Sequence, residues 1–121
     1  MNKLSILYVD DELLNLELFK INFRKKYEVH IADNGHSGLE ILNQIPGILI
    51  VLTDMKMPVM DGLEFIKKAK DIYPNKKFFI LTGFETNEEI REAMKQGLIV
   101  KHFKKPLNIK ELESSINEVI K

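Results

Sequence analysis

Residues 48–62 read ILIVLTDMKMPVMDG, and this stretch decides the fold. It begins with an unbroken apolar run from Ile48 to Thr53, which is typical of a strand covered by helices on both faces. Asp54 follows the run directly, and Asp61-Gly62 begins a segment with helical spacing. Met57-Pro58 shapes the loop between them. The stretch therefore predicts a buried strand, an acidic loop and a helix in succession.

The same alternation recurs on both sides of this stretch. Strands are expected at Leu4 to Val9, Tyr27 to Ala32, Ile48 to Thr53, Lys77 to Leu81 and Ile99 to Phe103. Helices are expected at Glu12 to Lys26, Ser37 to Gln44, Gly62 to Ile72, Asn87 to Gln96 and Ile109 to Ile120. Polar helix caps are expected at Asp61, Thr86 and Asn108. Five such alternations predict an α/β fold with a parallel sheet.

Composition limits the class of protein further. The chain has 121 residues, 45% of them hydrophobic, which suits one domain with a single sizeable core. Eighteen basic residues balance eighteen acidic ones, so no net charge attracts the chain to nucleic acid or to a membrane surface. Cysteine is absent, which excludes disulfides, thiolate nucleophiles and cysteine-bound zinc. We expect one soluble, cytoplasmic domain over residues 1–121, with no effector domain in the chain.

Polar side chains follow four of the predicted strands. In an open parallel sheet, ligands bind beyond the carboxyl ends of the strands, and here these ends carry Asp10-Asp11, Asp54, Thr82 and Lys105-Pro106. Carboxylates about 4 Å apart repel by about 4 kcal/mol per pair at an effective dielectric near 20, so the cluster requires a cation. An all-oxygen, water-accessible site suits Mg²⁺, with Mn²⁺ as the alternative.

This donor set also predicts a reaction. A carboxylate such as Asp54 attacks a phosphoryl group when a metal and a second cation neutralise the charge on the transferred oxygens. Lys105 is placed to supply that cation, and Thr82 is placed to hydrogen-bond the product. The sequence therefore predicts formation of an aspartyl phosphate.

These features together resemble the receiver domain of two-component response regulators, over the whole chain. The matching features are the acidic pair in Tyr8 to Glu12, the segment Asp54 to Gly62, Thr82 and Lys105-Pro106. The resemblance implies a doubly wound, flavodoxin-like (βα)5 sheet with strand order 2-1-3-4-5. It also implies a phosphorylation-activated switch, which catalyses its own phosphorylation and dephosphorylation only and is otherwise not an enzyme.

The resemblance assigns roles to the acidic residues. It implies that Asp54 is the phosphoacceptor and that Asp11 and Asp54 bind the metal directly. Asp10 would bind the metal mainly through water, and Lys56 would contribute its backbone carbonyl.

The resemblance also implies how the signal leaves the site. Lys105 would pair with the phosphoryl group, and the peptide bond before Pro106 would be cis. Thr82 would move toward the phosphoryl oxygens, and the aromatic residue three positions before the lysine would turn inward. This position holds His102, whose ring is smaller than that of tyrosine and becomes charged near neutral pH. If the register of the last strand slips, Phe103 takes the position instead.

Partners follow from the same resemblance. The phosphodonor would be a sensor histidine kinase or a histidine phosphotransfer protein. The output would be a downstream protein effector, an appended output domain or a phosphorylation-dependent homodimer. That dimer would form through helix four, strand five and helix five, including Ile90, Met94 and His102. No direct nucleic-acid or membrane contact is expected.

The first predicted helix carries two apolar stripes on nearly opposite faces. The stripe expected to face the core consists of Leu16, Phe19 and Phe23. The second stripe consists of Leu14, Leu18 and Ile21. It either packs against the fifth helix, which carries Leu112, Ile116 and Val119, or forms an exposed patch. In the second case Leu14 and Leu18 are candidates for docking the helix that bears a phosphohistidine.

The same residues also bear on other functions. A Mg²⁺-dependent phosphatase of the haloacid dehalogenase type needs a second aspartate two positions after the nucleophile, where this chain has Lys56. A flavin carrier needs a glycine- and hydroxyl-rich loop after the first strand, which Asp10-Asp11 does not provide. A degenerate receiver that only binds partners is disfavoured, since every phosphorylation residue is present. Lys56 and Phe84 are expected to tune the lifetime of the acyl phosphate.

Overall fold

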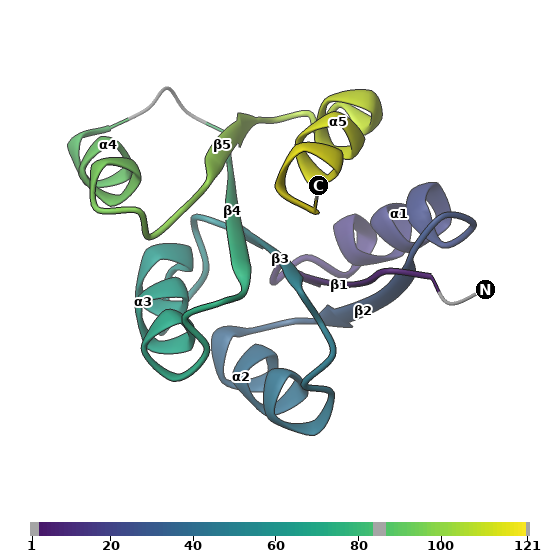
Figure 1. The fold of residues 1–121 in the computed structure, drawn as a ribbon, viewed down its shortest axis with the longest axis horizontal. Helices are drawn as coiled ribbons and strands as arrows, with labels where there is room; N and C mark the ends of the chain where they lie inside the picture. The colour runs from purple at the N-terminus through teal and green to yellow at the C-terminus, as the bar shows by residue number, and fades with distance from the viewer. Residues whose placement is uncertain (1–2, 84–86, 121) are drawn as a thin grey trace.

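The chain folds as five strands that alternate with five helices. The computed structural model describes residues 3–83 and 87–120. The elements are β1 (Ser5–Val9), α1 (Leu13–Phe23), β2 (Glu28–Ala32), α2 (Gly35–Gln44), β3 (Ile50–Asp54), α3 (Gly62–Ile72), β4 (Lys77–Thr82), α4 (Glu88–Lys95), β5 (Lys101–Lys104) and α5 (Ile109–Ile120) (Figure 1). The alternation predicted from the apolar runs is confirmed.

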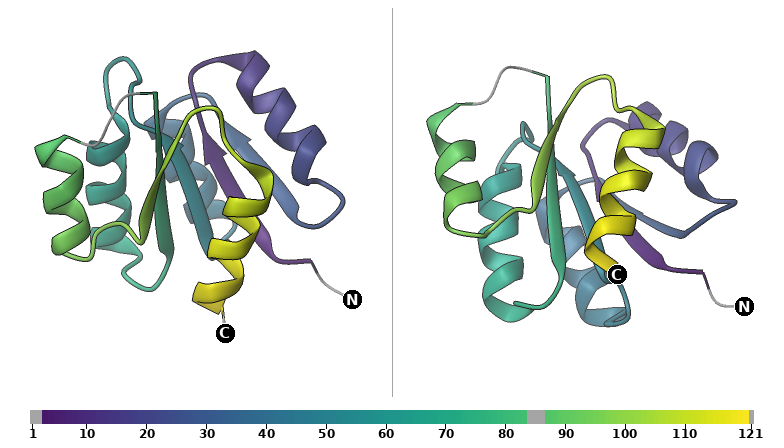
Figure 2. Two further views of the ribbon diagram at one scale, coloured as in Figure 1. Left: turned by 90° about the horizontal axis from the view of Figure 1, so that it is seen from above. Right: turned by 45° about the horizontal axis from the view of Figure 1, so that its top comes forward.

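All the strands are parallel and lie in the order β2-β1-β3-β4-β5, as the resemblance implied. Helices α1 and α5 cover one face of the sheet, and α2, α3 and α4 cover the other (Figures 1 and 2). β2 and β5 are the edge strands. The fold is therefore the doubly wound, flavodoxin-like sheet that was predicted. No helix in residues 3–83 and 87–120 has the length and apolar character needed to cross a membrane.

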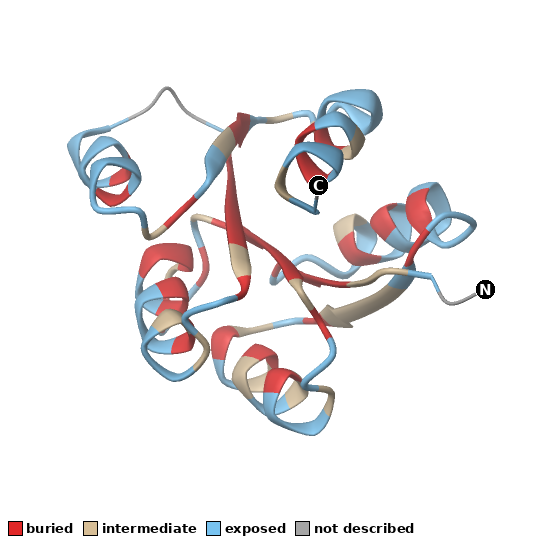
Figure 3. Cartoon of the chain, in the orientation of Figure 1, coloured by how far each residue is buried: buried red, intermediate tan, exposed pale blue. Residues whose placement is uncertain are grey.

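The sheet separates two hydrophobic clusters. One cluster lies between the sheet and α2, α3 and α4, and includes Leu42, Val51, Phe65, Ile66 and Ile90. The other lies under α1 and α5 and includes Tyr8, Phe19, Phe79, Phe103 and Ile116. Buried residues line the sheet and the inner faces of the helices (Figure 3). Burial on both faces explains why β3 is continuously apolar.

Local signals set most helix starts. Asp61 and Asn108 accept hydrogen bonds from the backbone N–H groups of Glu64 and Glu111, as predicted for caps. The cap of α4 is Asn87, which accepts from the N–H of Ile90, and the predicted cap Thr86 lies outside the described residues. α2 begins at Gly35, two residues before the predicted start, because Asn34 already accepts from the N–H of Ser37.

The two stripes of α1 have different surroundings. Leu16, Phe19 and Phe23 are buried, which confirms the predicted core face. Leu14, Leu18 and Ile21 are 68%, 48% and 58% exposed. The alternative that this second stripe packs against α5 is therefore wrong, because Leu112 and Ile116 of α5 are buried in the cluster that contains the first stripe. The second stripe is an exposed apolar patch.

The last strand starts later than predicted. β5 begins at Lys101, whereas Ile99 is buried in the connection from α4. Gly97 has φ 75°, a left-handed conformation that suits glycine and turns the chain after α4. Ile99 packs like a strand residue without lying in the sheet, which is why its hydrophobicity misled the prediction.

Candidate functional site

Three carboxylates meet where β1 and β3 end. These strands are neighbours, and Val9 is in register with Thr53, so the residues that follow them lie at one edge of the sheet. Oxygens of Asp10, Asp11 and Asp54 all lie within 4.8 Å of one another. Asp10 and Asp54 are buried, whereas Asp11 is exposed. The predicted acidic cluster therefore forms, and its all-oxygen donor set fits a hard divalent cation.

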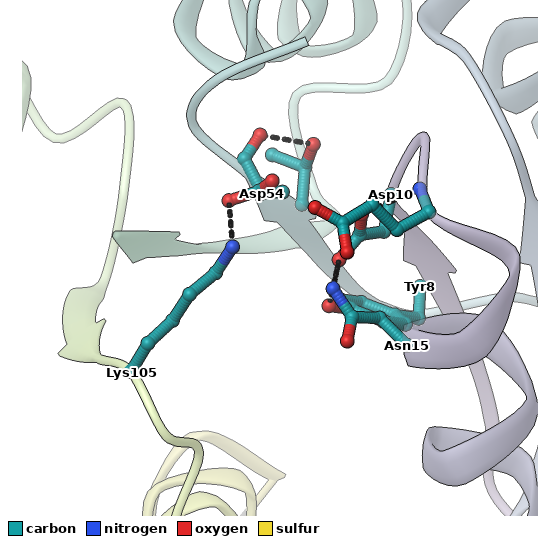
Figure 4. A network of polar contacts seen from close by, with 7 residues as sticks. Tyr8, Asp10, Asn15, Asp54 and Lys105 are labelled. Carbon is teal, nitrogen blue, oxygen red and sulfur yellow. Dashed lines mark hydrogen bonds and ion pairs between the residues drawn. The ribbon is translucent and has the colours of Figure 1, made fainter. Parts of the chain in front are cut away.

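Lys105 reaches this cluster from the loop after β5. Its Nζ lies 3.1 Å from Asp54 Oδ1, and the two side chains point toward each other in Figure 4. The backbone N–H of Lys105 donates to the carbonyl of Thr82 at 2.8 Å, which ties the loop to the end of β4. The Lys105–Pro106 peptide bond is cis, as expected from the resemblance. The lysine is thus held beside the predicted nucleophile.

Burial controls the charge on Asp54. It raises the pKa of the Asp54 carboxyl above its ordinary value, and the Lys105 ammonium opposes this by lowering it. The negative charges of Asp10 and Asp11 raise the pKa further. The net direction is upward, so ionised Asp54 is under electrostatic stress that a nearby cation relieves.

Asp10 is held by three hydrogen-bond donors. Its Oδ2 accepts from the Tyr8 hydroxyl at 2.5 Å and from Asn15 Nδ2 at 3.1 Å (Figure 4). Its Oδ1 accepts from the backbone N–H of Glu12 at 2.9 Å. Burial and the hydrogen bond to Asp10 raise the pKa of the Tyr8 phenol far above its usual range, so it stays protonated and donates. Tyr8 and Asn15 were not predicted as site residues, although strand alternation places Tyr8 and Asp10 on one face of β1.

The loop between β3 and α3 is closed by a tight turn. The N–H of Met60 donates to the carbonyl of Pro58 at 2.8 Å, and Val59 between them has φ 71°. This is the φ value of a strained three-residue γ-turn, and it is unusual for a β-branched side chain. Burial of Met57 and Met60 on either side holds the loop in place.

Gly62 allows this loop to pack directly against the nucleophile. Its N–H donates to the carbonyl of Met55 at 2.8 Å. A Cβ at this position would lie 2.3 Å from the backbone oxygen of Asp54. The glycine that was predicted only to start the helix therefore also fits α3 against the backbone of Asp54.

Thr82 and Lys56 lie close to each other in the structure. Thr82 ends β4 and is buried, whereas Lys56 is exposed. Both line an open cavity of about 550 Å³, together with Met55, Met57, Pro58, Asp61, Asn87 and Glu89. The cavity lies between the β3–α3 loop and the start of α4, and Asp10, Asp11 and Asp54 are not among the residues that line it. Phe84, the other expected tuning residue, lies outside the described residues.

His102 occupies the predicted position on β5. It is in register with Ile80 and half-buried, with Nδ1 3.3 Å from Met94 Sδ on α4. Phe103 lies on the opposite face, buried and stacked on Phe79 with ring centroids 5.7 Å apart. Phe103 is therefore a core residue, and His102 is the residue that faces α4.

Comparison with known proteins gives a consistent result. The response regulator receiver domain family matches residues 6–117. Sporulation initiation phosphotransferase F of Bacillus subtilis is 32% identical over 117 residues, which cover 96% of this chain and 93% of that protein. The transcriptional regulatory protein YesN of the same organism is 47% identical over 91 residues, which cover 74% of this chain but 24% of YesN. A response regulator receiver domain protein from Clostridium thermocellum has a TM-score of 0.89 and 33% identity, covering 97% of this chain and 94% of that chain.

The chain therefore belongs to the response regulator receiver domain family. Domains of this family are phosphorylation switches of two-component systems rather than classical enzymes. Phosphorylation on aspartate and use of Mg²⁺ at an acidic pocket are features of the family. The chain spans nearly all of sporulation initiation phosphotransferase F and about a quarter of YesN.

Proposed function

We propose that residues 1–121 form one receiver domain that accepts a phosphoryl group on Asp54 from a phosphohistidine. The donor is a sensor histidine kinase or a histidine phosphotransfer protein. The observation that carries the proposal is the 3.1 Å pair between Lys105 Nζ and Asp54 Oδ1 inside a cluster of three carboxylates. A purely structural ion pair would not need two further carboxylates beside it, since these raise the pKa of Asp54.

Asp54, Lys105 and Thr82 have separate roles in the proposed phosphoryl transfer. An Asp54 oxygen forms the new P–O bond while the bond from phosphorus to the donor nitrogen breaks, and its electron pair stays on the imidazole. The Lys105 ammonium is positioned to move from the carboxylate to the transferred oxygens and to neutralise their charge. Thr82 then donates to the aspartyl phosphate.

Asp10, Asp11 and Asp54, with the Lys56 carbonyl, would hold Mg²⁺ in this site. The ion supplies charge neutralisation for the phosphoryl oxygens. Since both oxygens of Asp10 already accept hydrogen bonds, a water-mediated role suits Asp10 better than direct binding. The Lys56 side chain is exposed, so its role in the metal site would be limited to the backbone.

A small phosphodonor tests this proposal. Incubation with acetyl phosphate and Mg²⁺ is expected to add one phosphoryl group, measured as intact mass. The gain should require Mg²⁺, disappear on treatment with hydroxylamine and be absent in Asp54→Asn, because only an acyl phosphate on this carboxylate meets all three conditions. Asp33→Asn, which removes an exposed carboxylate just after β2, is the matched control and should be phosphorylated like the wild type.

The same experiment separates the alternatives. Absence of any mass gain in the wild type would leave a degenerate receiver that acts through binding alone. Continuous release of phosphate from unrelated phosphate esters would instead support a phosphatase. The exposed Lys56 stands where such an enzyme needs an acid, and it disfavours this outcome.

The exposed stripe of α1 is proposed to dock the phosphodonor. Leu18 lines a cavity of about 490 Å³ between α1 and the loop before α5, and Lys105 lines the same cavity. The cavity therefore extends from Leu18 of the apolar stripe to Lys105, the lysine beside Asp54. A helix that bears a phosphohistidine fits this arrangement, because its apolar side chains would cover Leu14 and Leu18 while the histidine reaches Asp54.

Leu18→Glu is expected to slow phosphotransfer from a purified phosphorylated histidine phosphotransfer protein by about tenfold, equivalent to about 1.4 kcal/mol of lost docking energy. Phosphorylation by acetyl phosphate should stay at the wild-type rate, because the small donor does not need the stripe. The control is Ile72→Glu, an equally drastic change at an exposed position of α3. Equal slowing with both donors, or loss of folding, would contradict docking at Leu18.

The proposed output surface lies around the edge strand β5, between α4 and α5. His102 and Met94 are in contact there, and Lys101 Nζ lies 3.7 Å from Glu111 Oε1. Movement of Thr82 toward a phosphoryl group would change the space next to β5, and His102 would respond by turning inward. We propose that an effector protein, an output domain or a second copy of the chain reads the rearranged surface of α4, β5 and α5.

A further inference from the structure

We propose that Tyr8 and Asn15 are positioning residues that hold the Asp10 carboxylate in the orientation required by the metal site. The inference rests on the proposed function, because it concerns the same acidic cluster. It assigns a role to two side chains that contact neither the phosphoacceptor nor the proposed lysine in the network of Figure 4.

The geometry brings two separate elements onto one oxygen. Tyr8 lies in β1 two residues before Asp10, which directly follows the strand, so the two side chains point to the same face of the sheet. Asn15 comes from the first turns of α1 and reaches the same atom, Asp10 Oδ2. The backbone N–H of Glu12 occupies a place on Oδ1. The carboxylate is therefore fixed from the strand, the loop and the helix together.

The hydrogen bonds to Asp10 leave few acceptor sites on its carboxylate for a cation or its water ligands. Each carboxylate oxygen accepts about two hydrogen bonds. Oδ2 of Asp10 is filled by the Tyr8 hydroxyl and the Asn15 amide, and Oδ1 has one place left beside the Glu12 N–H. The three donors therefore leave Asp10 one contact, which a metal-bound water can fill.

Tyr8 is itself rigid. The residue is 3% exposed, and its ring stacks on Phe19 with centroids 4.4 Å apart and planes 24° from parallel. Because the ring is rigid, the Tyr8 hydroxyl can donate to the Asp10 carboxylate in only one orientation of that carboxylate. Asp10 is fully buried, and a buried carboxylate that loses a donor must reorient to find another. Reorientation would remove its remaining contact from the cluster.

Tyr8→Phe tests the role of the hydroxyl, because the ring and its stacking remain. Mg²⁺ affinity, measured by isothermal titration calorimetry, is expected to fall about tenfold, as for other groups that orient metal ligands. The Mg²⁺ concentration for half-maximal phosphorylation by acetyl phosphate should rise by the same factor, while the rate at saturating Mg²⁺ stays near that of the wild type. Asn15→Ala is expected to shift Mg²⁺ affinity in the same direction.

Tyr27→Phe is a matched control. Tyr27 is also a buried tyrosine of the cluster under α1 and α5, but its hydroxyl has no hydrogen-bond partner among the described residues. Its removal should leave Mg²⁺ affinity unchanged. Equal affinities of wild type and Tyr8→Phe, or equal losses in Tyr8→Phe and Tyr27→Phe, would overturn the inference. Absence of Mg²⁺ binding in the wild type would instead refute the metal site of the proposed function.

Discussion

Lys105→Met is expected to slow phosphorylation of Asp54 by acetyl phosphate by about 100-fold at saturating Mg²⁺, the size of effect seen when one donor to a developing anion is removed. Methionine keeps an unbranched chain of similar length but has no positive charge. Lys105 Nζ lies 3.1 Å from Asp54 Oδ1, so the substitution removes a positive charge in direct contact with the nucleophile. The initial rate of mass gain measures the effect.

Lys104→Met provides the matched control for Lys105. Lys104 is the preceding residue, is exposed and lies in β5, so the same substitution there should leave the rate of phosphorylation unchanged. A Lys105→Met protein that is phosphorylated as fast as the wild type would contradict the role of the ammonium in the reaction.

Lys105→Met should also change how the free energy of unfolding depends on pH. The folded-state pKa of Asp54 lies above its ordinary value of 3.8, so the folded state holds the Asp54 proton more tightly than the unfolded state does. Stability therefore falls as pH rises from 3.8 through the raised pKa, and the loss is complete above it. Lys105 lowers this pKa, so its removal should make the fall in unfolding free energy with pH larger in Mg²⁺-free buffer.

Gly62→Ala is expected to lower the free energy of unfolding by about 3 kcal/mol, at the upper end of the usual cost of overpacking. The new Cβ would lie 2.3 Å from the Asp54 carbonyl oxygen and 3.0 Å from Met55 Cα. Both are backbone atoms, so relief requires moving the segment that carries Asp54. Urea unfolding measures the loss, and slower phosphorylation should accompany it.

Gly47→Ala separates this clash from the general effect of replacing a glycine. A Cβ at Gly47 would meet no atom within 4 Å, and its φ lies outside the left-handed region. This variant should be as stable as the wild type or slightly more stable, since alanine restricts the unfolded chain. Similar stabilities for both variants would show that α3 can move away from Asp54 at little cost.

The sequence was sufficient for the sheet and for the acidic cluster. Strands buried on both faces are continuously apolar, and the carboxyl ends of parallel strands meet at one edge. Asp10, Asp11, Asp54 and Lys105 could therefore be assigned to one site before any distance was known. Helix caps at Asp61 and Asn108 were also predictable, because they depend on neighbours within three residues.

The parts that could not be predicted depend on packing between distant segments. The sequence assigned Phe19 to the core face of α1, but whether Leu18 packs against α5 or stays exposed depends on the position of α5. The two side-chain donors to Asp10, Tyr8 and Asn15, come from different elements, so the Asn15 contact follows only from the placement of α1. The γ-turn at Val59 could not be predicted either, because valine rarely adopts a positive φ and only the burial of its neighbours holds it in this conformation.

The edge strands limit how the molecule can associate. β2 carries a hydrogen bond between Glu28 Oε1 and His30 Nε2, which lie 3.0 Å apart, and β5 is four residues long with exposed Lys101 and Lys104. Short edges with charged side chains resist the addition of a strand from another chain. At high concentration the sheet is thus protected from edge-to-edge growth, and association is directed to helix and loop surfaces, where the contact can be reversed.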